Sequence, residues 1–141
     1  MLNILVPVDG SEASTRAVQA AISLAQHDPQ AVLHILTAPT PIVSGNVRRF
    51  FSEDVLHAYY QDEGNNALNS ARAVLHESGV TVHEAIVPGN AAEVIKQYVL
   101  DHQCNHIVMG TRGLSALPSL VLGSVTTKVL HLVDVPVTLI K

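Results

Sequence analysis

The sequence predicts an α/β fold in which an open five-stranded parallel sheet carries helices on both faces. Short apolar runs typical of strands alternate strictly with amphipathic helical patterns along the chain, and such alternation favours a parallel sheet. The 141 residues are 48% hydrophobic and only 14% charged, which is enough apolar material for one core. Because no repeat, low-complexity tract or linker interrupts the pattern, we expect a single domain over residues 1–141.

The first quarter of the chain contains two expected strands and the helix between them. Residues 2–8 form a short apolar run with β-branched members, which is typical of a buried strand. The turn that follows leads into a helical pattern, and Ser11 is the candidate N-cap. Pro29 blocks continuation of this helix, and residues 31–37 then predict a second buried strand.

The middle of the chain contains a loop, a long helix and a third strand. Residues 38–45 include two prolines and a glycine and predict a loop. Residues 50–77 follow helical spacing, although Gly64 inside them indicates a kink or break. Residues 80–87 alternate apolar and polar side chains, which predicts a strand with one half-exposed face at a sheet edge.

The last third of the chain supplies two helices and two strands. Residues 91–99 carry a clear apolar stripe at helical spacing, and residues 107–110 form a short apolar strand that ends in glycine. A final helical stripe runs over residues 122–132, and residues 135–140 close the chain as a strand.

Composition excludes several classes of function. The net charge is -4 and the eight Lys and Arg residues are scattered, so we expect no nucleic-acid partner. No apolar run reaches the ~18 residues that a membrane span needs, and no charged leader precedes the first strand, so we expect a cytoplasmic protein. Cys104 is the single cysteine, which rules out an internal disulfide and fits a reduced compartment.

The histidines of the chain do not predict a metal site. His102, Cys104 and His106 lie close in sequence but span a helix end and a strand start, and no second cluster has ligand spacing. His34, inside the second strand, is expected to be a packed, hydrogen-bonded side chain. No G-x-S-x-G motif supports nucleophilic catalysis.

The residues that follow the first and fourth strands predict a ligand site. In open parallel sheets, ligands bind beyond the carboxyl ends of the strands, where the strand order reverses. Gly110 and Gly113 follow the fourth strand, and Gly123 and Ser124 open the last helix, so backbone N–H groups and a helix start are available to a phosphate. Asp9 follows the first strand, where its carboxylate can accept hydrogen bonds from ribose hydroxyls or an amino group. Neither G-x-x-x-x-G-K-[ST] nor G-x-G-x-x-G is present.

With these motifs the chain resembles the ATP-binding branch of the universal stress protein family over essentially its full length. Residues 4–11 resemble the first strand and turn of that family, and residues 123–137 its last helix and strand. The most specific feature is the spacing G-x2-G-x9-G-[ST], which Gly110, Gly113, Gly123 and Ser124 satisfy. The resemblance implies a Rossmann-like fold of the adenine nucleotide alpha hydrolase kind, with strand order 3-2-1-4-5.

The resemblance also implies the ligand and the residues that bind it. The ligand is ATP, with Mg²⁺ or Mn²⁺ on its phosphates. Asp9 would contact the adenosine part, Ile35 would lie against the adenine ring, and the glycines would surround ribose and phosphates. The full set carried over by position is Pro7, Asp9, Ile35, Met109, Gly110, Arg112, Gly113, Gly123, Ser124 and Val125. The intervening apolar stretch contains Pro118 but belongs to a part of the motif that tolerates variation.

The family commonly forms dimers through its final strand, which implies that residues 135–140 pair antiparallel with a second copy. An apolar edge strand left uncovered favours aggregation, so this pairing also has a physical reason. The expected function is therefore that of a dimeric, nucleotide-binding module in a stress response. Two alternatives stay open at this point: a slow ATPase, for which Arg112 is the cation and no base is evident, and a dimeric interaction module that binds no nucleotide.

Overall fold

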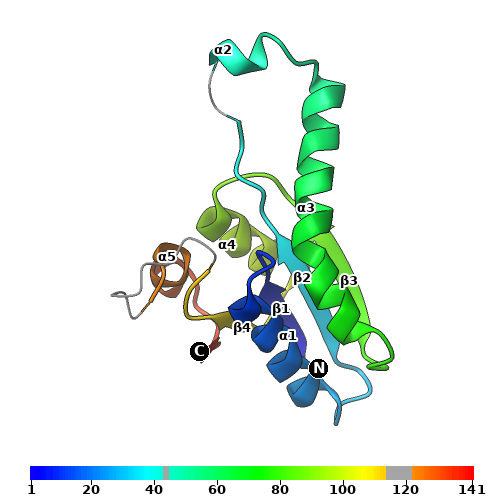
Figure 1. The fold of residues 1–141 in the computed structure, drawn as a ribbon. Helices are drawn as coiled ribbons and strands as arrows, with labels where there is room; N and C mark the ends of the chain where they lie inside the picture. Colours follow the sequence, from blue (N-terminus) through cyan, green and yellow to red (C-terminus); the bar gives the residue numbers. More distant parts are fainter. Residues whose placement is uncertain (43–44, 114–121) are drawn as a thin grey trace.

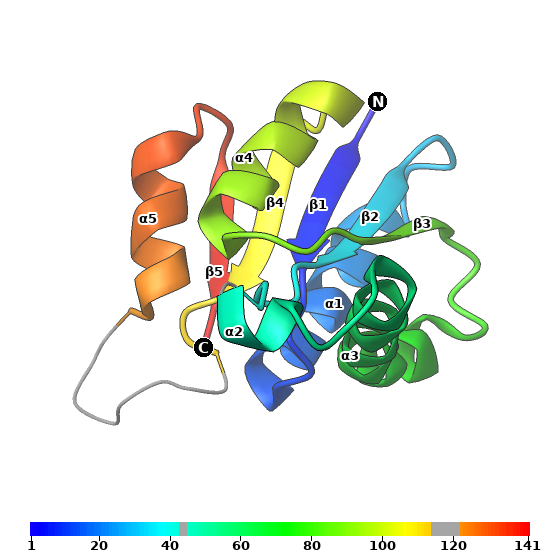
Figure 2. The same cartoon turned by 90° about the horizontal axis from the view of Figure 1, so that it is seen from above.

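A five-stranded parallel sheet forms the centre of the molecule, with strand order β3-β2-β1-β4-β5 (Figures 1 and 2). The computed structural model describes residues 1–42, 45–113 and 122–141. All four neighbouring pairs of strands are parallel, which confirms the predicted fold class and strand order. The strands are β1 (Asn3–Pro7), β2 (Val32–Thr37), β3 (Thr81–Ile86), β4 (His106–Gly110) and β5 (Val137–Ile140).

Helices cover both faces of the sheet. On one face lie α1 (Glu12–Ala25) and α3 (Glu53–Leu75), and on the other lie α4 (Ala91–His102) and α5 (Ser124–Leu132) (Figure 2). A short helix that the sequence did not predict, α2 (Gly45–Arg48), begins at the end of the expected loop. Together with the first turns of α3, it projects beyond the sheet (Figure 1). Residues 43 and 44 of that loop lie outside the described residues.

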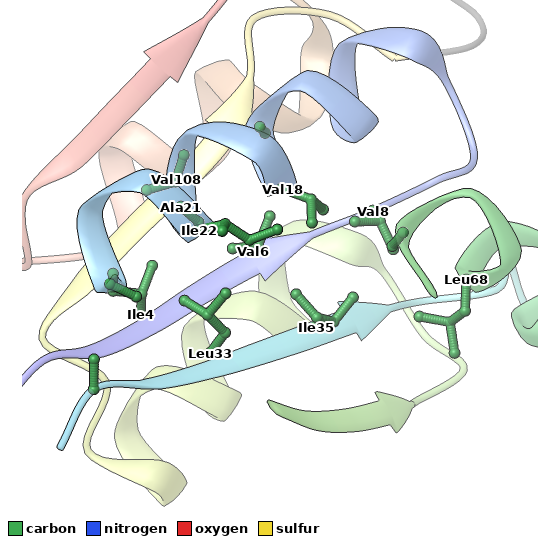
Figure 3. Close-up of a cluster of buried hydrophobic side chains, with 14 residues drawn as sticks. Ile4, Val6, Val8, Val18, Ala21, Ile22, Leu33, Ile35, Leu68 and Val108 are labelled. Carbon is green, nitrogen blue, oxygen red and sulfur yellow. The ribbon is translucent and has the colours of Figure 1, made fainter. Parts of the chain in front are cut away.

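The core consists of two clusters, one on each face of the sheet. Alternate residues of a strand point to opposite faces, so Ile4 and Val6 pack under α1 while Leu5 packs under α4. Figure 3 shows the first cluster, in which Leu68 of α3 and Ile35 of β2 also meet. Strands buried on both faces explain the nearly continuous apolar runs of the sequence.

Gly64 does not break α3, which is a single helix from Glu53 to Leu75. The predicted kink is therefore wrong. Gly64 is buried, and a Cβ atom added to it would lie 2.5 Å from Cγ2 of Ile86 on β3. The glycine lets the helix approach the sheet closely, which is a tertiary requirement that local helix propensity does not reveal.

The two edges of the sheet are β3 and β5. β3 has mostly exposed or half-exposed residues, in agreement with the edge position predicted from its alternating pattern. All four residues of β5 are half-buried, and this strand is two residues shorter than the predicted 135–140 because Val135 and Pro136 precede it. None of the described helices is long and apolar enough to span a membrane.

Candidate functional site

A cavity of about 290 Å³ opens at the carboxyl ends of β1, β2 and β4. It lies where the sequence predicts a ligand site, because the strand order reverses between β1 and β4. The first turn of α5 and one side of α4 complete its walls. Its lining residues are Pro7, Val8, Asp9, Ser14, Leu36, Thr37, Ala38, Ala91, Ile95, Met109, Gly110, Arg112, Gly113, Gly123, Ser124, Val125 and Thr126.

Nine of the ten residues predicted from the sequence line this one cavity. They are Pro7, Asp9, Met109, Gly110, Arg112, Gly113, Gly123, Ser124 and Val125. Residues more than a hundred positions apart in the chain thus converge on the same edge of the sheet. Their contact with a nucleotide stays a prediction, whereas their assembly around a single cavity is a feature of the structure.

Ile35 is the predicted residue that the structure does not bring to the cavity. It is 1% exposed and belongs to the core cluster under α1 and α3. Its neighbour Leu36 points to the opposite face and lines the cavity instead, followed by Thr37 and Ala38. Because both faces of β2 are apolar, its sequence carries no signal that distinguishes the two orientations.

Some lining residues were not identified from the sequence. Ser14 follows the N-cap Ser11 by three residues, so helical spacing alone places it on the same side of α1 as that cap. Ala91 and Ile95 belong to the apolar stripe predicted for residues 91–99, and they also line the cavity. The remaining lining residues outside the predicted set are Val8, Leu36, Thr37, Ala38 and Thr126.

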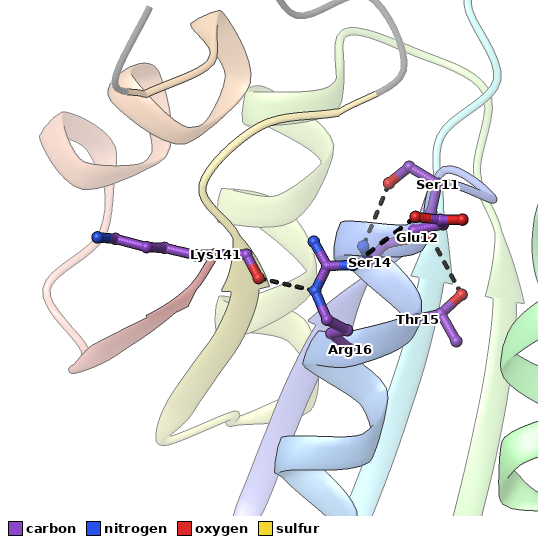
Figure 4. A network of polar contacts seen from close by, with 6 residues as sticks. All are labelled: Ser11, Glu12, Ser14, Thr15, Arg16 and Lys141. Atoms are coloured by element: carbon purple, nitrogen blue, oxygen red, sulfur yellow. Dashed lines mark hydrogen bonds and ion pairs between the residues drawn. The ribbon is translucent and has the colours of Figure 1, made fainter.

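The carboxylate of Asp9 is held in place at the mouth of the cavity. Its Oδ1 atom accepts a hydrogen bond from the backbone N–H of Ser11 at 2.9 Å. Ser11 itself is the N-cap of α1, and its hydroxyl accepts from the N–H of Ser14, as predicted (Figure 4). Asp9 thus supports the turn before α1, while Ser11 takes the role of helix cap.

Gly113 brings its loop into close contact with Asp9. A Cβ atom at position 113 would fall on Oδ2 of Asp9, closer than side-chain atoms approach one another. A larger residue at position 113 would therefore have to displace the carboxylate of Asp9, which lies directly beside the loop after β4. The two halves of the predicted site touch at this point.

The first turn of α5 presents backbone N–H groups to the cavity. Gly123 is its N-cap and has no side chain to accept from these donors, and no acidic residue lies in the first turn. Helix α5 is hydrogen-bonded to the end of β4, because the hydroxyl of Thr126 donates to the carbonyl of Gly110 at 3.0 Å. The N–H of Gly123 donates to the carbonyl of Thr111 at 2.6 Å. This end of a helix favours an anion.

The charges at the cavity are few. Among its described lining residues, Arg112 is the cation and Asp9 the anion. Arg112 is exposed, so it can move toward a phosphate without a large desolvation cost. Lys128 is exposed and lies outside the lining residues. Pro118 and the rest of the apolar stretch at 114–121 lie outside the described residues.

The fold and the cavity define an α/β protein of the Rossmann-like class, with its cavity at the point where strand order reverses. The model of the universal stress protein family matches residues 1–141, so the chain belongs to that family, as the sequence motifs indicated.

Known relatives agree with this assignment. The universal stress protein YxiE of Bacillus subtilis is 32% identical over 98% of this chain and 97% of its own length. The solved structure of protein MJ0577, from Methanocaldococcus jannaschii, has a TM-score of 0.85 and 26% identity, and the match covers 99% of this chain and 95% of that one. A universal stress protein solved in complex with cAMP has a TM-score of 0.73 and 27% identity over 99% of this chain and 97% of its own.

Proposed function

We propose that this protein binds an adenine nucleotide, with ATP as its ligand, in the cavity at the carboxyl ends of β1 and β4. The observation that carries the proposal is the convergence of the complete glycine-serine motif on one cavity, opposite the fixed carboxylate of Asp9. A universal stress protein solved with cAMP supports the adenine nucleotide class.

The phosphates would lie at the α5 side of the cavity. Ser124 and Val125 begin α5, and Gly113 lines the same cavity, so their backbone N–H groups would bind the phosphates. The hydroxyl of Ser124 adds a further donor. Arg112 supplies the positive charge on this side. Mg²⁺ or Mn²⁺ would accompany the phosphates and neutralise part of their charge.

The adenosine part would lie between β1, β2 and α4. Met109, Ile95 and Ala38 provide apolar walls for a flat ring, and the carboxylate of Asp9 can accept hydrogen bonds from ribose hydroxyls. The cavity of about 290 Å³ is at the lower end of the ~300–1,000 Å³ that small-molecule sites occupy, which fits one compact ligand.

We further propose that the protein is one domain that acts in the cytoplasm as a homodimeric regulatory module. The open edge of β5 supports the dimer, because an uncovered edge strand readily pairs with an identical strand of a second copy. Residues 135–140 would form this interface, with β5 itself (Val137–Ile140) as its hydrogen-bonded part.

Mass spectrometry and calorimetry test the nucleotide proposal. The protein is purified without added nucleotide and denatured, and the released small molecules are identified. Titration of the emptied protein with ATP, AMP, cAMP and GTP then gives the affinities. We expect ATP to bind with one site per chain and GTP to bind more weakly. Stability should rise by about 2.7 kcal/mol at a ligand concentration 100-fold above its Kd.

Two glycine variants provide the matched comparison. Gly113→Ala places a Cβ atom against Asp9 and should lower the affinity for ATP at least severalfold, and Gly113→Trp should abolish binding. In Gly45→Ala the added atom meets nothing within 4 Å, so its affinity should equal that of the wild type. A wild type that releases no nucleotide and shows no stabilisation by millimolar ATP would overturn the proposal and favour the interaction-module alternative.

A further inference from the structure

A groove on the other side of α4 contains a group of histidines that the proposed nucleotide site does not use. We call it the histidine groove. It lies between α4 and the outer strands β2 and β3, and its lining residues are His34, His83, Glu84, Ala85, Val87, Glu93, Val94, Gln97, Tyr98, Asp101 and His102.

Three imidazole rings and one phenol ring are in contact in this groove. The ring of His34 stacks on that of His83 with centroids 5.4 Å apart, and it lies 5.7 Å from the ring of His102. The ring of Tyr98 stacks on His102 at 3.8 Å. Nδ1 of His34 and the hydroxyl oxygen of Tyr98 are hydrogen-bonded at 2.8 Å, which confirms the prediction of a packed, hydrogen-bonded histidine at position 34.

The cluster joins three elements, two strands and one helix. His34 belongs to β2, and His83 is its direct partner on β3 in the parallel register. Tyr98 and His102 lie in the last turns of α4. His34 is 7% exposed, whereas His83 and His102 are exposed and reach solvent. Solvent therefore reaches the two outer rings, and positive charge on them lowers the pKa of the buried His34 ring.

Three carboxylates, those of Glu84, Glu93 and Asp101, also line the groove. From α4, Glu93 and Asp101 face the groove, and Asp101 accepts a hydrogen bond from Gln97 at 2.8 Å. From β3, the carboxylate of Glu84 is bound by Arg72 at 2.9 Å, so its charge is already paired. From β1, the register partner of His34 is the apolar Leu5.

The phenol and the thiol near the cluster stay neutral at acidic pH. Burial raises the pKa of Tyr98, and it raises the pKa of the Cys104 thiol to about 11. Burial, together with the charges that His83 and His102 can carry, lowers the pKa of His34 to about 4. The packed arrangement thus favours the neutral form of the His34 ring.

Helix α4 is a wall shared by the histidine groove and the nucleotide cavity. Tyr98 and His102 face the groove, while Ala91 and Ile95, on the preceding turns, line the cavity. β2 is shared in the same way, since His34 lies in the groove and Leu36, two residues further along the same face, lies in the cavity. A shift of α4 relative to β2 changes both hollows together.

We propose that the histidine groove is a proton-responsive control element, in which protonation of its histidines moves α4 and thereby weakens nucleotide binding in the cavity behind that helix. Positive charges on β3 and on the last turn of α4 repel each other across the buried ring of His34. The repulsion acts between the helix and the sheet, and α4 carries Ala91 and Ile95 with it. This inference rests on the proposed nucleotide function for its final step.

The test compares two double variants with the wild type. The groove variant, His83→Gln/His102→Gln, removes both exposed imidazole rings while keeping neutral side chains of similar size. His27→Gln/His76→Gln is the control, because both of these histidines are exposed and lie outside the groove. Affinity for ATP is measured by calorimetry at several pH values between 7.5 and 5.5. The phosphates of ATP also titrate in this range, and comparison with the groove variant at each pH removes their contribution.

We expect the wild type and the control variant to lose about fivefold to tenfold more affinity on acidification than the groove variant. A second measurement needs no nucleotide: the backbone amide resonances of Ala91 and Ile95 are followed by NMR over the same pH range. These resonances should shift in the wild type and stay fixed in the groove variant.

The outcomes separate the two proposals. If the wild type binds ATP but its affinity changes with pH as that of the groove variant does, the proposal of a control element is wrong and the nucleotide proposal stands. If ATP fails to bind at every pH, the nucleotide proposal fails, and with it the final step of this inference. If the amide resonances of Ala91 and Ile95 do not shift with pH in the nucleotide-free wild type, the proposed coupling through α4 is wrong in either case.

Discussion

Thr126 joins the two halves of the glycine motif through one buried hydroxyl. It is 3% exposed, and its hydroxyl donates to the carbonyl of Gly110. We expect Thr126→Val to lower the free energy of unfolding by about 1–2 kcal/mol, because the shape is kept while the half-buried carbonyl of Gly110 loses its partner. Urea denaturation measures the change.

Thr127→Val is the matched control for this prediction. The hydroxyl of Thr127 donates to the carbonyl of Gly123, but that carbonyl also accepts the backbone N–H of Thr127, and the side chain is exposed. Its substitution should change stability by less than about 0.5 kcal/mol. Equal losses in the two variants would contradict a special role for the Thr126 bond.

His34 makes stability depend on pH. Its pKa is about 4 in the folded protein because burial disfavours the charged ring, against about 6.5 in an unfolded chain. Between these values the unfolded state binds the proton more readily. The stability that the neutral His34 ring contributes is therefore complete above pH 6.5. It is lost as the pH falls toward 4, at no more than about 1.4 kcal/mol per pH unit.

The variant His34→Asn isolates this contribution. An asparagine amide can replace the ring nitrogen that bonds Tyr98, and it does not titrate. Unfolding free energies from urea titrations at pH 7.5, 6.0 and 5.0 should converge between wild type and variant as the pH falls. Two parallel profiles would show that His34 does not carry the effect.

The residues of the site show where sequence reasoning succeeds and where it stops. Gly110, Gly113 and Gly123 were found because their spacing belongs to one motif and each stands just after a strand or before a helix. Ile35 was placed in the site although Leu36 occupies it. Ile35 and Leu36 are adjacent in a strand whose two faces are equally apolar, so the sequence does not show which of them faces the cavity. The packing of helices on the sheet determines the orientation.

At the level of elements, the contact between α3 and β3 depends on Gly64. We expect Gly64→Ala to destabilise the protein, although alanine gains about 1 kcal/mol of helix propensity over glycine. The added Cβ would lie 2.5 Å from Cγ2 and 2.8 Å from Cδ1 of Ile86, and such crowding costs about 1–3 kcal/mol. Thermal and urea denaturation give the net change.

A double-mutant cycle tests whether the crowding is the cause. In Gly64→Ala/Ile86→Ala the new methyl group has space, so the two substitutions should be less destabilising together than the sum of their separate effects. Gly45→Ala, where nothing lies within 4 Å of the added atom, is the neutral control. Additive effects of the two substitutions would remove close packing as the explanation.

Most elements were predicted because each carries its own periodic pattern and its own stop signals. The alternation of strands and helices, the edge position of β3 and the N-cap of α1 follow from local signals that agree with the tertiary structure, whereas the strand order followed from the family resemblance. The exceptions are elements that depend on distant contacts. The sequence alone predicts Gly64 to break the helix, because the contact with Ile86 is visible only in the tertiary structure. Helix α2 has only four residues, which are too few to show a helical period.

At the scale of the whole molecule, the open edge of β5 predicts how two copies meet. Ile107 and Thr111 donate their N–H groups to the carbonyls of Pro136 and Ile140. Backbone groups alternate sides along a strand, so the N–H of Val137 faces away from β4. We expect Val137→Pro to abolish a dimer formed through this edge while the monomer keeps its fold. Sedimentation and circular dichroism measure the two properties.

Val137→Ala is the control, because it shortens the side chain and keeps the N–H group. It should sediment as the wild type does. A wild type that sediments as a monomer, or a Val137→Pro variant that stays dimeric, would place any dimer interface elsewhere on the molecule.

The stacking of Tyr98 on His102 also has a spectroscopic consequence. The chain contains no tryptophan and three tyrosines, of which Tyr59 and Tyr60 lie on α3, away from the histidine groove. Tyr98 alone combines ring stacking with a hydrogen bond to an imidazole among the described tyrosines. Its ultraviolet emission is therefore sensitive to the position of α4, and the native protein carries an optical reporter of that helix without any label.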